Sequence, residues 1–286
     1  MTSLRQAIEL TFQVRPSWMN GKSVQTSRIN TNHCLRLLGE ELDIATIKPS
    51  TFTLLGTQLI EEGKSPATVN RIFAALGTCL KECHLENLLE NVPSYRRMKE
   101  PPSRKDYYSQ AELKTLLAVA PSMDEGELLR DSILFIYLTG CRKAELVDLE
   151  WSDVDLENKT LTFRDTKNGE DHEMAIHKDL QSLLETLKEN RIDERVFTWL
   201  NSAQFGYYMK KLCKKTGIGL REDGKSSRTI HQLRHTCATD LVTAGVPIKS
   251  IQAVLNHKKI ETTMKYAHDT AESIANAVNE IPSLIN

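Results

Sequence analysis

Residues 231–245 read "HQLRHTCATDLVTAG". His231 and His235 are four residues apart, which is the spacing of the two zinc ligands in a metalloprotease helix. The glutamate base of such a site is replaced here by Gln232, and Arg234 stands between the histidines. Three interpretations of this spacing are therefore possible: a damaged zinc site, a packing feature or a different chemistry.

The residues just before this stretch favour an anion over a metal. Thr229 and Gln232 have the spacing of a capping box, so a helix is predicted to start there with His231 in its first turn. The N-terminus of a helix is electropositive and binds phosphate groups well. We therefore predict no metal and no cofactor, and we expect His235 to support the helix rather than to take part in chemistry.

The composition is that of an ordinary globular protein. The chain has 286 residues, 40% of them hydrophobic, and a formal net charge of −1. The N-terminus lacks an apolar signal core and the longest apolar run, 133–138, is too short to span a bilayer, so we expect a cytoplasmic protein. The six cysteines are scattered, and we expect free, buried thiols rather than a disulfide framework.

Charge is distributed unevenly along the chain. Residues 201–286 hold 12 Lys and Arg against 7 Asp and Glu, a net charge of +5, and this basic third contains the opening stretch. A solvated surface and a phosphate-facing surface explain that excess equally well.

The periodicity predicts a mainly α protein with a small antiparallel β-sheet, an α+β class, in two domains. Residues 1–95 have helical apolar spacing and form a predicted bundle, whose fourth helix starts at Ser65 and Pro66. Residues 96–108 are basic and rich in proline, which is typical of a linker. Residues 109–286 form the predicted second domain.

The second domain is predicted to begin with a capping box at Ser109 and to contain a helix, 128–138, that is apolar on nearly all faces. Residues 149–176 alternate and are broken by turn-rich stretches, which predicts three short strands joined by hairpins. Helices are predicted for most of the remainder, including 261–267 and 270–280.

Four further residues stand in order around the opening stretch. Arg142 follows the buried helix, Lys167 lies in a hairpin turn, His257 ends a helix and Tyr266 comes nine residues later. Each alone has an ordinary explanation, such as a surface ion pair, a solvated lysine, a helix cap or a core tyrosine. Their coincidence in one chain is harder to explain in this way.

The ordered set of Arg142, Lys167, His231-x-x-Arg234, His257 and Tyr266 resembles the tyrosine site-specific recombinases, the phage integrase family. The resemblance spans essentially the whole chain. Asn256 departs from the glycine that is usual before the histidine, and no catalytic group is replaced.

The resemblance implies DNA strand exchange through a 3′-phosphotyrosyl intermediate, with Tyr266 as the nucleophile. It implies that Arg142 and Arg234 bind the phosphate oxygens, that Lys167 protonates the leaving oxygen and that His257 donates a hydrogen bond. His231 is expected to handle the tyrosine proton, and Glu145 to orient its neighbours.

The resemblance further implies a double-stranded DNA recombination site as partner and a homotetramer that exchanges its C-terminal helix between protomers. It implies a domain division into a core-DNA-binding domain and a catalytic domain without an arm-binding domain. We expect accessory proteins that bend DNA or set the direction of recombination. We also expect the enzyme to be associated with the nucleoid and to be encoded by a prokaryote or a phage. Candidate DNA contacts, chosen as exposed polar or basic residues, are Thr68, Asn70, Arg71, Arg97, Lys210, Lys214 and Arg228.

Two alternatives remain at the level of sequence. A type IB topoisomerase uses the same kind of tyrosine and phosphate clamp to relax DNA. A catalytically silent DNA-binding regulator of the same fold would keep the pattern without the reaction. Integration or excision of a mobile element and Xer-like resolution are both compatible with a recombinase.

Overall fold

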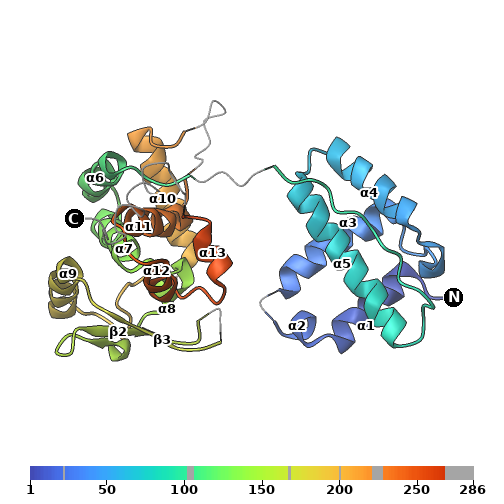
Figure 1. Cartoon of the computed structure of the whole chain (residues 1–286), viewed down its shortest axis with the longest axis horizontal. Helices are drawn as coiled ribbons and strands as arrows, with labels where there is room; N and C mark the ends of the chain where they lie inside the picture. Colours follow the sequence, from blue (N-terminus) through green and yellow to red (C-terminus); the bar gives the residue numbers. More distant parts are fainter. Residues whose placement is uncertain (22, 102–105, 167–168, 200, 221–227, 268–286) are drawn as a thin grey trace, which may run out of the picture. The chain divides into compact units, whose positions relative to one another are not determined.

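The computed structural model describes residues 1–21, 23–101, 106–166, 169–199, 201–220 and 228–267. The chain forms two compact units, Met1–Ser103 and Arg104–Asn286. Each unit has its own buried core, and Figure 1 shows helices in both and a small sheet in the second. No helix within the described ranges is long and apolar enough to cross a membrane.

The described part of the first unit is helical, as predicted. Its elements are α1 (Leu4–Val14), α2 (Pro16–Met19), α3 (Val24–Leu38), the short 3-10 helix η1 (Ile44–Thr46), α4 (Pro49–Glu61) and α5 (Pro66–Leu85). Ser65 accepts a hydrogen bond from the backbone N–H of Thr68, and Pro66 occupies the first turn, so α5 starts where the sequence predicts.

Helix α5 is the centre of the first unit, because α1, α3 and α4 all pack against it (Figure 1). Its Phe73 meets Phe52 of α4 edge to face, with ring centroids 5.4 Å apart. Tyr95, which follows α5 in the chain, stacks on Phe52 at 4.5 Å. The chain therefore returns along the bundle after α5 and covers part of it.

The predicted linker, 96–108, has residues at both ends that pack within a unit. Met98 packs against the core of the first unit, and its backbone N–H donates to the side chain of Asn70 at 2.8 Å. Tyr108 is buried in the core of the second unit, and its N–H donates to Thr236 at 2.8 Å.

The second unit is built around a buried helix. Its elements are α6 (Gln110–Val119), η2 (Ala120–Ser122), α7 (Gly126–Thr139), α8 (Lys143–Asp148), η3 (Trp151–Asp153), β1 (Val154–Asp155), β2 (Thr160–Phe163), β3 (His172–Ala175), α9 (Lys178–Glu189), α10 (Ser202–Thr216), α11 (Ile230–Thr243), α12 (Ile248–Val254) and α13 (Ile260–Met264). Helix α7 packs against α6, α8, α9, α10 and α11, as its apolar faces predict.

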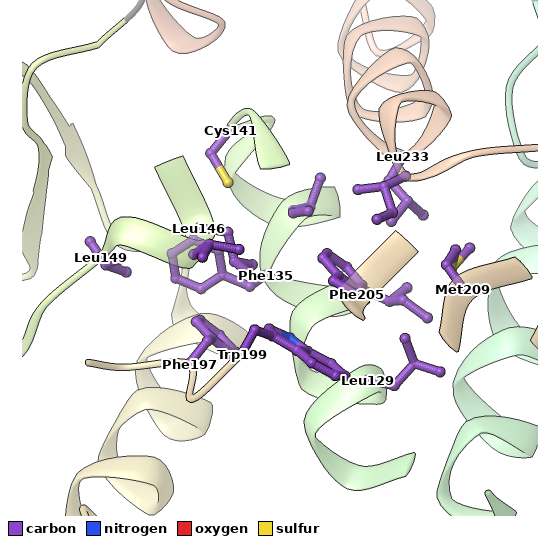
Figure 2. Packing of buried hydrophobic residues seen from close by; sticks show 14 of the residues in the cluster. Leu129, Phe135, Cys141, Leu146, Leu149, Phe197, Trp199, Phe205, Met209 and Leu233 are labelled. Carbon is purple, nitrogen blue, oxygen red and sulfur yellow. The ribbon is translucent and has the colours of Figure 1, made fainter. Parts of the chain in front are cut away.

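Side chains from distant parts of the sequence converge on α7. Figure 2 shows Phe135 of α7, Leu146 of α8, Phe205 of α10 and Leu233 of α11 in one cluster, with Trp199 lying across it. The Trp199 indole N–H donates to the buried Ser132 hydroxyl at 2.8 Å, so its polar atom is satisfied inside the core. All six cysteines are free and buried, as expected.

The sheet has the predicted antiparallel order β1-β2-β3, but its first strand is shorter than predicted. Residues 151–153 form a 3-10 turn, because Asp153 accepts from the backbone N–H of Glu150 at 3.2 Å and folds the chain back. The predicted helix 261–267 also ends early, at Met264, so that Tyr266 lies just beyond it. The predicted helix 270–280 lies outside the described residues.

The end of α7 needs a glycine for two reasons. Gly140 has φ +64°, a left-handed conformation in which L side chains are strained. A Cβ atom there would also lie 2.6 Å from Leu255 and 3.2 Å from the Cys237 sulfur. The end of α7 is thereby brought close to both α11 and α12.

Adjacent leucines of α4 test the packing of the first unit. Leu55 is fully buried, and Leu55→Ala should lower the free energy of unfolding by roughly 2–5 kcal/mol through lost burial and a cavity. Leu54 is 66% exposed, so Leu54→Ala, the matched control, should change it by no more than about 0.5 kcal/mol. Urea unfolding measures both, and equal losses would contradict this packing.

Candidate active site

Arg234 lies on α11 and joins the ends of two other helices. Its side chain is buried, one terminal nitrogen donates to the carbonyl of Gly140 at 2.6 Å, and the other donates to the carbonyl of Leu255. Gly140 and Leu255 are the C-cap residues of α7 and α12, where carbonyls lack partners within the helix and the helix dipole is negative. The guanidinium therefore satisfies carbonyls at two helix ends.

Arg142 approaches the same corner from the start of α8. Its guanidinium donates to Glu145 at 2.6 Å and to the carbonyl of Asn256 at 3.1 Å. Glu145 also accepts from the backbone N–H of Arg142 at 2.7 Å, which fixes the first turn of α8. Both arginines are thus oriented by neighbouring carbonyls at the end of α12.

Among the described side chains, the charges at this corner do not balance. Burial, followed by the neighbouring Arg142, lowers the pKa of Arg234, although a guanidinium stays protonated at neutral pH. Glu145 supplies the carboxylate that pairs with Arg142. Two cations facing one anion leave a net positive charge that a bound phosphate would offset.

His257 follows α12 and is held by a threonine of α13. Its Nδ1 lies 2.9 Å from the hydroxyl of Thr263. Burial and then Arg234 and Arg142 lower the pKa of His257 to about 4, so the ring is neutral at pH 7. When the Thr263 hydroxyl donates to Nδ1, the single ring proton sits on Nε2, which is then a hydrogen-bond donor.

Tyr266 lies next to His257 and contacts His235. The rings of Tyr266 and His257 are nearly parallel with centroids 6.5 Å apart, and the Tyr266 hydroxyl forms a hydrogen bond with Nδ1 of His235. Burial raises the pKa of Tyr266, and Arg234 acts against that rise. The phenol is therefore neutral at pH 7 and lies beside the arginine corner.

The side chain of His235, which is expected to support its helix rather than to take part in chemistry, contacts Tyr266. His231 occupies the first turn of α11 as predicted, but its side chain is exposed. Its ring lies edge to face against His235, with centroids 4.6 Å apart. The second histidine of the opening stretch is thus the one that shares a hydrogen bond with the tyrosine hydroxyl.

Lys167 lies outside the described residues, but the residue before it is fixed. The hydroxyl of Thr166 accepts from the Asn256 amide at 3.2 Å and donates to the carbonyl of Glu170 at 2.8 Å. Asn256 itself has φ +46°, a left-handed conformation that asparagine tolerates better than most residues. Within the described ranges, no three His, Cys, Asp or Glu side chains gather as a metal site would need.

The candidate DNA contacts of the first unit differ in their exposure to solvent. Arg71 is exposed, and Thr68 is half-buried at the start of α5. Arg97 is exposed and pairs with Glu100 at 3.1 Å. Asn70, in contrast, is buried and donates to the carbonyl of Met98 at 2.9 Å and to Glu100 at 2.7 Å. Its amide holds the returning chain, and its role as a DNA contact stays a prediction.

In the second unit, Lys210 and Lys214 are exposed on α10. Arg228 is different, because its side chain is only 17% exposed and pairs with Asp106 at 3.6 Å and Glu112 at 3.7 Å. These ion pairs tie the segment before α11 to α6. Arg228 therefore has ion-pair partners within its own unit, and its role as a DNA contact stays a prediction.

Sequence reasoning missed two further groups at the site. Asn256 was noted only as a departure from glycine, although its carbonyl and its amide both make contacts there. His172 of β3 forms a 3.3 Å hydrogen bond with the carbonyl of Val254 and so supports the end of α12. Nothing in the alternating pattern of its strand marks His172 as different from a surface residue.

Comparison with known proteins identifies the family. Residues 107–273, more than half of the chain, match the phage integrase family. The chain is 29% identical over 274 residues to the tyrosine recombinase XerA of Pyrococcus furiosus, covering 94% of this chain and 92% of that protein. It is 27% identical to the tyrosine recombinase XerC of Corynebacterium glutamicum, covering 77% and 74% respectively.

Solved structures show the same fold. The Tn1549 transposon integrase in complex with transposon right end DNA superposes with a TM-score of 0.82, covering 98% of this chain and 99% of that chain at 19% identity. The lambda integrase tetramer bound to a Holliday junction gives 0.78, with 96% and 81% covered at 21% identity. Because the family match covers more than half of the chain and the fold agrees with it, the chain belongs to the phage integrase family and is a site-specific tyrosine recombinase.

Proposed function

We propose that this enzyme cuts and rejoins DNA at a specific duplex site by forming a 3′-phosphotyrosyl bond through Tyr266. One observation carries the proposal: the Tyr266 ring lies beside a corner where Arg142 and Arg234 are held by carbonyls at the end of α12. The net positive charge there fits a phosphodiester, and the tyrosine is a nucleophile adjacent to it.

The arginines are proposed to bind the non-bridging oxygens of the scissile phosphate. The two carbonyl contacts of Arg234 use two of its five N–H donors, which leaves its fork able to make further hydrogen bonds. Because the guanidinium is already held, little reorganisation is needed when charge builds on the phosphate. Glu145 is proposed to orient Arg142 rather than to react.

The remaining groups are proposed to move or share protons. Lys167 would protonate the departing 5′-oxygen, which is otherwise a poor leaving group. His257 would donate a hydrogen bond from Nε2 to the phosphate, since Thr263 occupies Nδ1. His231, exposed in the first turn of α11, would meet the phosphate at the positive end of that helix.

Double-stranded DNA is the proposed partner of both units. Three lysines that sequence reasoning missed, Lys249, Lys258 and Lys259, line a shallow surface hollow at α12 and α13 and would contact the DNA backbone. Lys210, Lys214, Arg71, Arg97 and Thr68 keep their proposed role as DNA contacts. The first unit is proposed to be the core-DNA-binding domain and the second the catalytic domain.

Assembly is proposed by analogy with the solved relatives. Lambda integrase has been solved as a tetramer bound to a Holliday junction. We propose that this chain also acts as a tetramer, with residues after 267 exchanged between protomers and with accessory DNA-bending proteins. Integration, excision and Xer-like resolution share the same strand chemistry, and attachment-like repeats beside the gene would identify an integrase.

The nucleophile is tested by covalent trapping. A nicked duplex, selected from a random pool by binding to the wild-type protein, should give an SDS-resistant adduct in EDTA. Tyr266→Phe should abolish the adduct because the attacking oxygen is removed. Tyr207→Phe is the matched control, since Tyr207 is 61% exposed on α10, and it should retain the adduct.

Three results would contradict the proposed function. An adduct that persists in Tyr266→Phe would place the nucleophile elsewhere. The absence of an adduct with wild-type protein on a verified site would favour a silent DNA-binding regulator. Relaxation of any plasmid without sequence preference would favour a topoisomerase.

The phosphate clamp is tested by Arg234→Lys, which keeps the charge but loses the fork. We expect adduct formation to slow by roughly 100- to 1,000-fold while DNA binding is retained. Arg130→Lys is the control, because the Arg130 side chain is 39% exposed, pairs with Glu127 and Asp131, and should change the rate less than about twofold. Lost binding with an unchanged cleavage rate per bound complex would refute the catalytic role of Arg234.

Asn256 tests the link between backbone conformation and the arginine corner. Asn256→Gly keeps the left-handed backbone and its carbonyl, whereas Asn256→Ala should lower the free energy of unfolding by roughly 1–2 kcal/mol more than the glycine variant. Urea unfolding compares the two variants. Equal stability of the alanine and glycine variants would mean that the corner does not need this backbone conformation.

A further inference from the structure

We propose that His235 is the catalytic base that accepts the phenolic proton of Tyr266 as the tyrosine attacks the scissile phosphate. The inference rests on the proposed function and adds a residue to it. Its starting observation is the hydrogen bond between the Tyr266 hydroxyl and Nδ1 of His235.

His235 contacts the nucleophile and is the neighbour in the chain of Arg234, one arginine of the proposed phosphate clamp. It follows Arg234 directly on α11, and its ring centroid is 5.4 Å from that of Tyr266. The backbone N–H of Tyr266 donates to the carbonyl of Thr263 at 2.9 Å, so a turn at the end of α13 holds the tyrosine near α11. Proton transfer needs such direct hydrogen-bond contact before other requirements matter.

The other histidines of the site are less suited to this step. His257 shares its Nδ1 with the hydroxyl of Thr263, and its nearly parallel ring lies 6.5 Å from that of Tyr266. His231 is exposed one turn earlier and contacts the ring of His235. Within the described part of the chain, His235 is the histidine that shares a hydrogen bond with the tyrosine hydroxyl.

The charges around His235 keep its ring neutral, which is the form that can accept a proton. The groups facing it are His231 and Arg234 on its own helix, Tyr266 after α13, and His257 before α13. Burial and then Arg234 lower the pKa of His235, so the ring is neutral at pH 7 and Nδ1 can accept from the phenol. The acceptor form persists as pH rises and is lost only below that lowered pKa.

Binding of the DNA phosphate would make His235 a stronger base than it is in the free protein. Without DNA, the charge of Arg234 disfavours a second cation on His235. A phosphate bound at the arginines brings a negative charge that offsets this repulsion, so the imidazolium becomes easier to form. The proton acceptor and the phosphate clamp are thereby coupled through adjacent residues of α11.

Each bond that forms in the proposed step is matched by a bond that breaks. The O–H bond of Tyr266 breaks and an N–H bond forms at Nδ1 of His235, while the tyrosine oxygen bonds to phosphorus. The bond from phosphorus to the 5′-oxygen breaks, and that oxygen takes a proton from the proposed acid Lys167. In the rejoining step the 5′-hydroxyl returns its proton to Lys167 as its oxygen bonds to phosphorus. The bond from phosphorus to the tyrosine oxygen breaks, and the imidazolium returns its proton to that oxygen, so no proton is consumed over the cycle.

The test is the pH dependence of single-turnover adduct formation on the nicked site. Wild-type protein should give a nearly constant rate between about pH 7 and 9, because His235 is neutral throughout. His235→Ala should be slower by roughly 100-fold or more at pH 7, and its rate should rise about tenfold per pH unit. That slope is expected because cleavage would then require tyrosinate, whose fraction rises tenfold per unit below the phenol pKa.

Two further variants separate a base from a positioning group. His235→Asn can accept the hydrogen bond but not the proton, so it should show the same slope as His235→Ala. His231→Ala should lack the slope. Thermal unfolding of each variant checks that α11 remains folded.

Four results would overturn the inference. A wild-type profile in His235→Asn, or a loss in His235→Ala by the same factor at every pH, would make His235 a positioning residue. A slope in His231→Ala alone would make His231 the acceptor. If wild-type protein formed no adduct at any pH, the proposed function would fail, and this inference with it.

Discussion

The buried guanidinium of Arg234 is the interaction on which the site depends. A charge taken out of water is costly unless its hydrogen bonds are satisfied, and here carbonyls at the ends of α7 and α12 provide that satisfaction. These carbonyls would otherwise lack hydrogen-bond partners within their helices, so one side chain satisfies carbonyls at two helix ends. The same geometry leaves a net positive charge at this corner, which a bound phosphate would offset.

The end of α12 organises that corner through three successive backbone carbonyls. Val254 bonds with His172, Leu255 accepts from Arg234, and Asn256 accepts from Arg142. Three consecutive carbonyls can point to three different partners only if the chain turns sharply, and the positive φ of Asn256 makes this turn. Stability and function are therefore linked here, since a residue that straightens the turn would move both arginines.

Patterns along single helices were less informative where another segment covers the helix. The polar start of α5 suggested a surface for Asn70, yet the returning chain at Met98 buries that amide and bonds with it. Arg228 was selected for its charge, but it is paired with acidic side chains around α6. Hydrophobic periodicity identifies the apolar face of a helix but does not show which polar residues a neighbouring segment will use.

The sequence by itself determined the class of fold, the helix starts at Ser65 and Ser109, the buried helix 128–138 and the family, because capping, periodicity and an ordered motif are local properties. It also identified Arg142, Arg234, His257 and Tyr266 as candidates, and the structure brings these four to one corner. Only the tertiary structure decided which histidine of "HQLRH" meets the tyrosine. His231 and His235 are equivalent by spacing, but one is exposed at the first turn of α11 and the other faces Tyr266. That difference comes from the packing of α11 against the segment after α13, which no local pattern encodes.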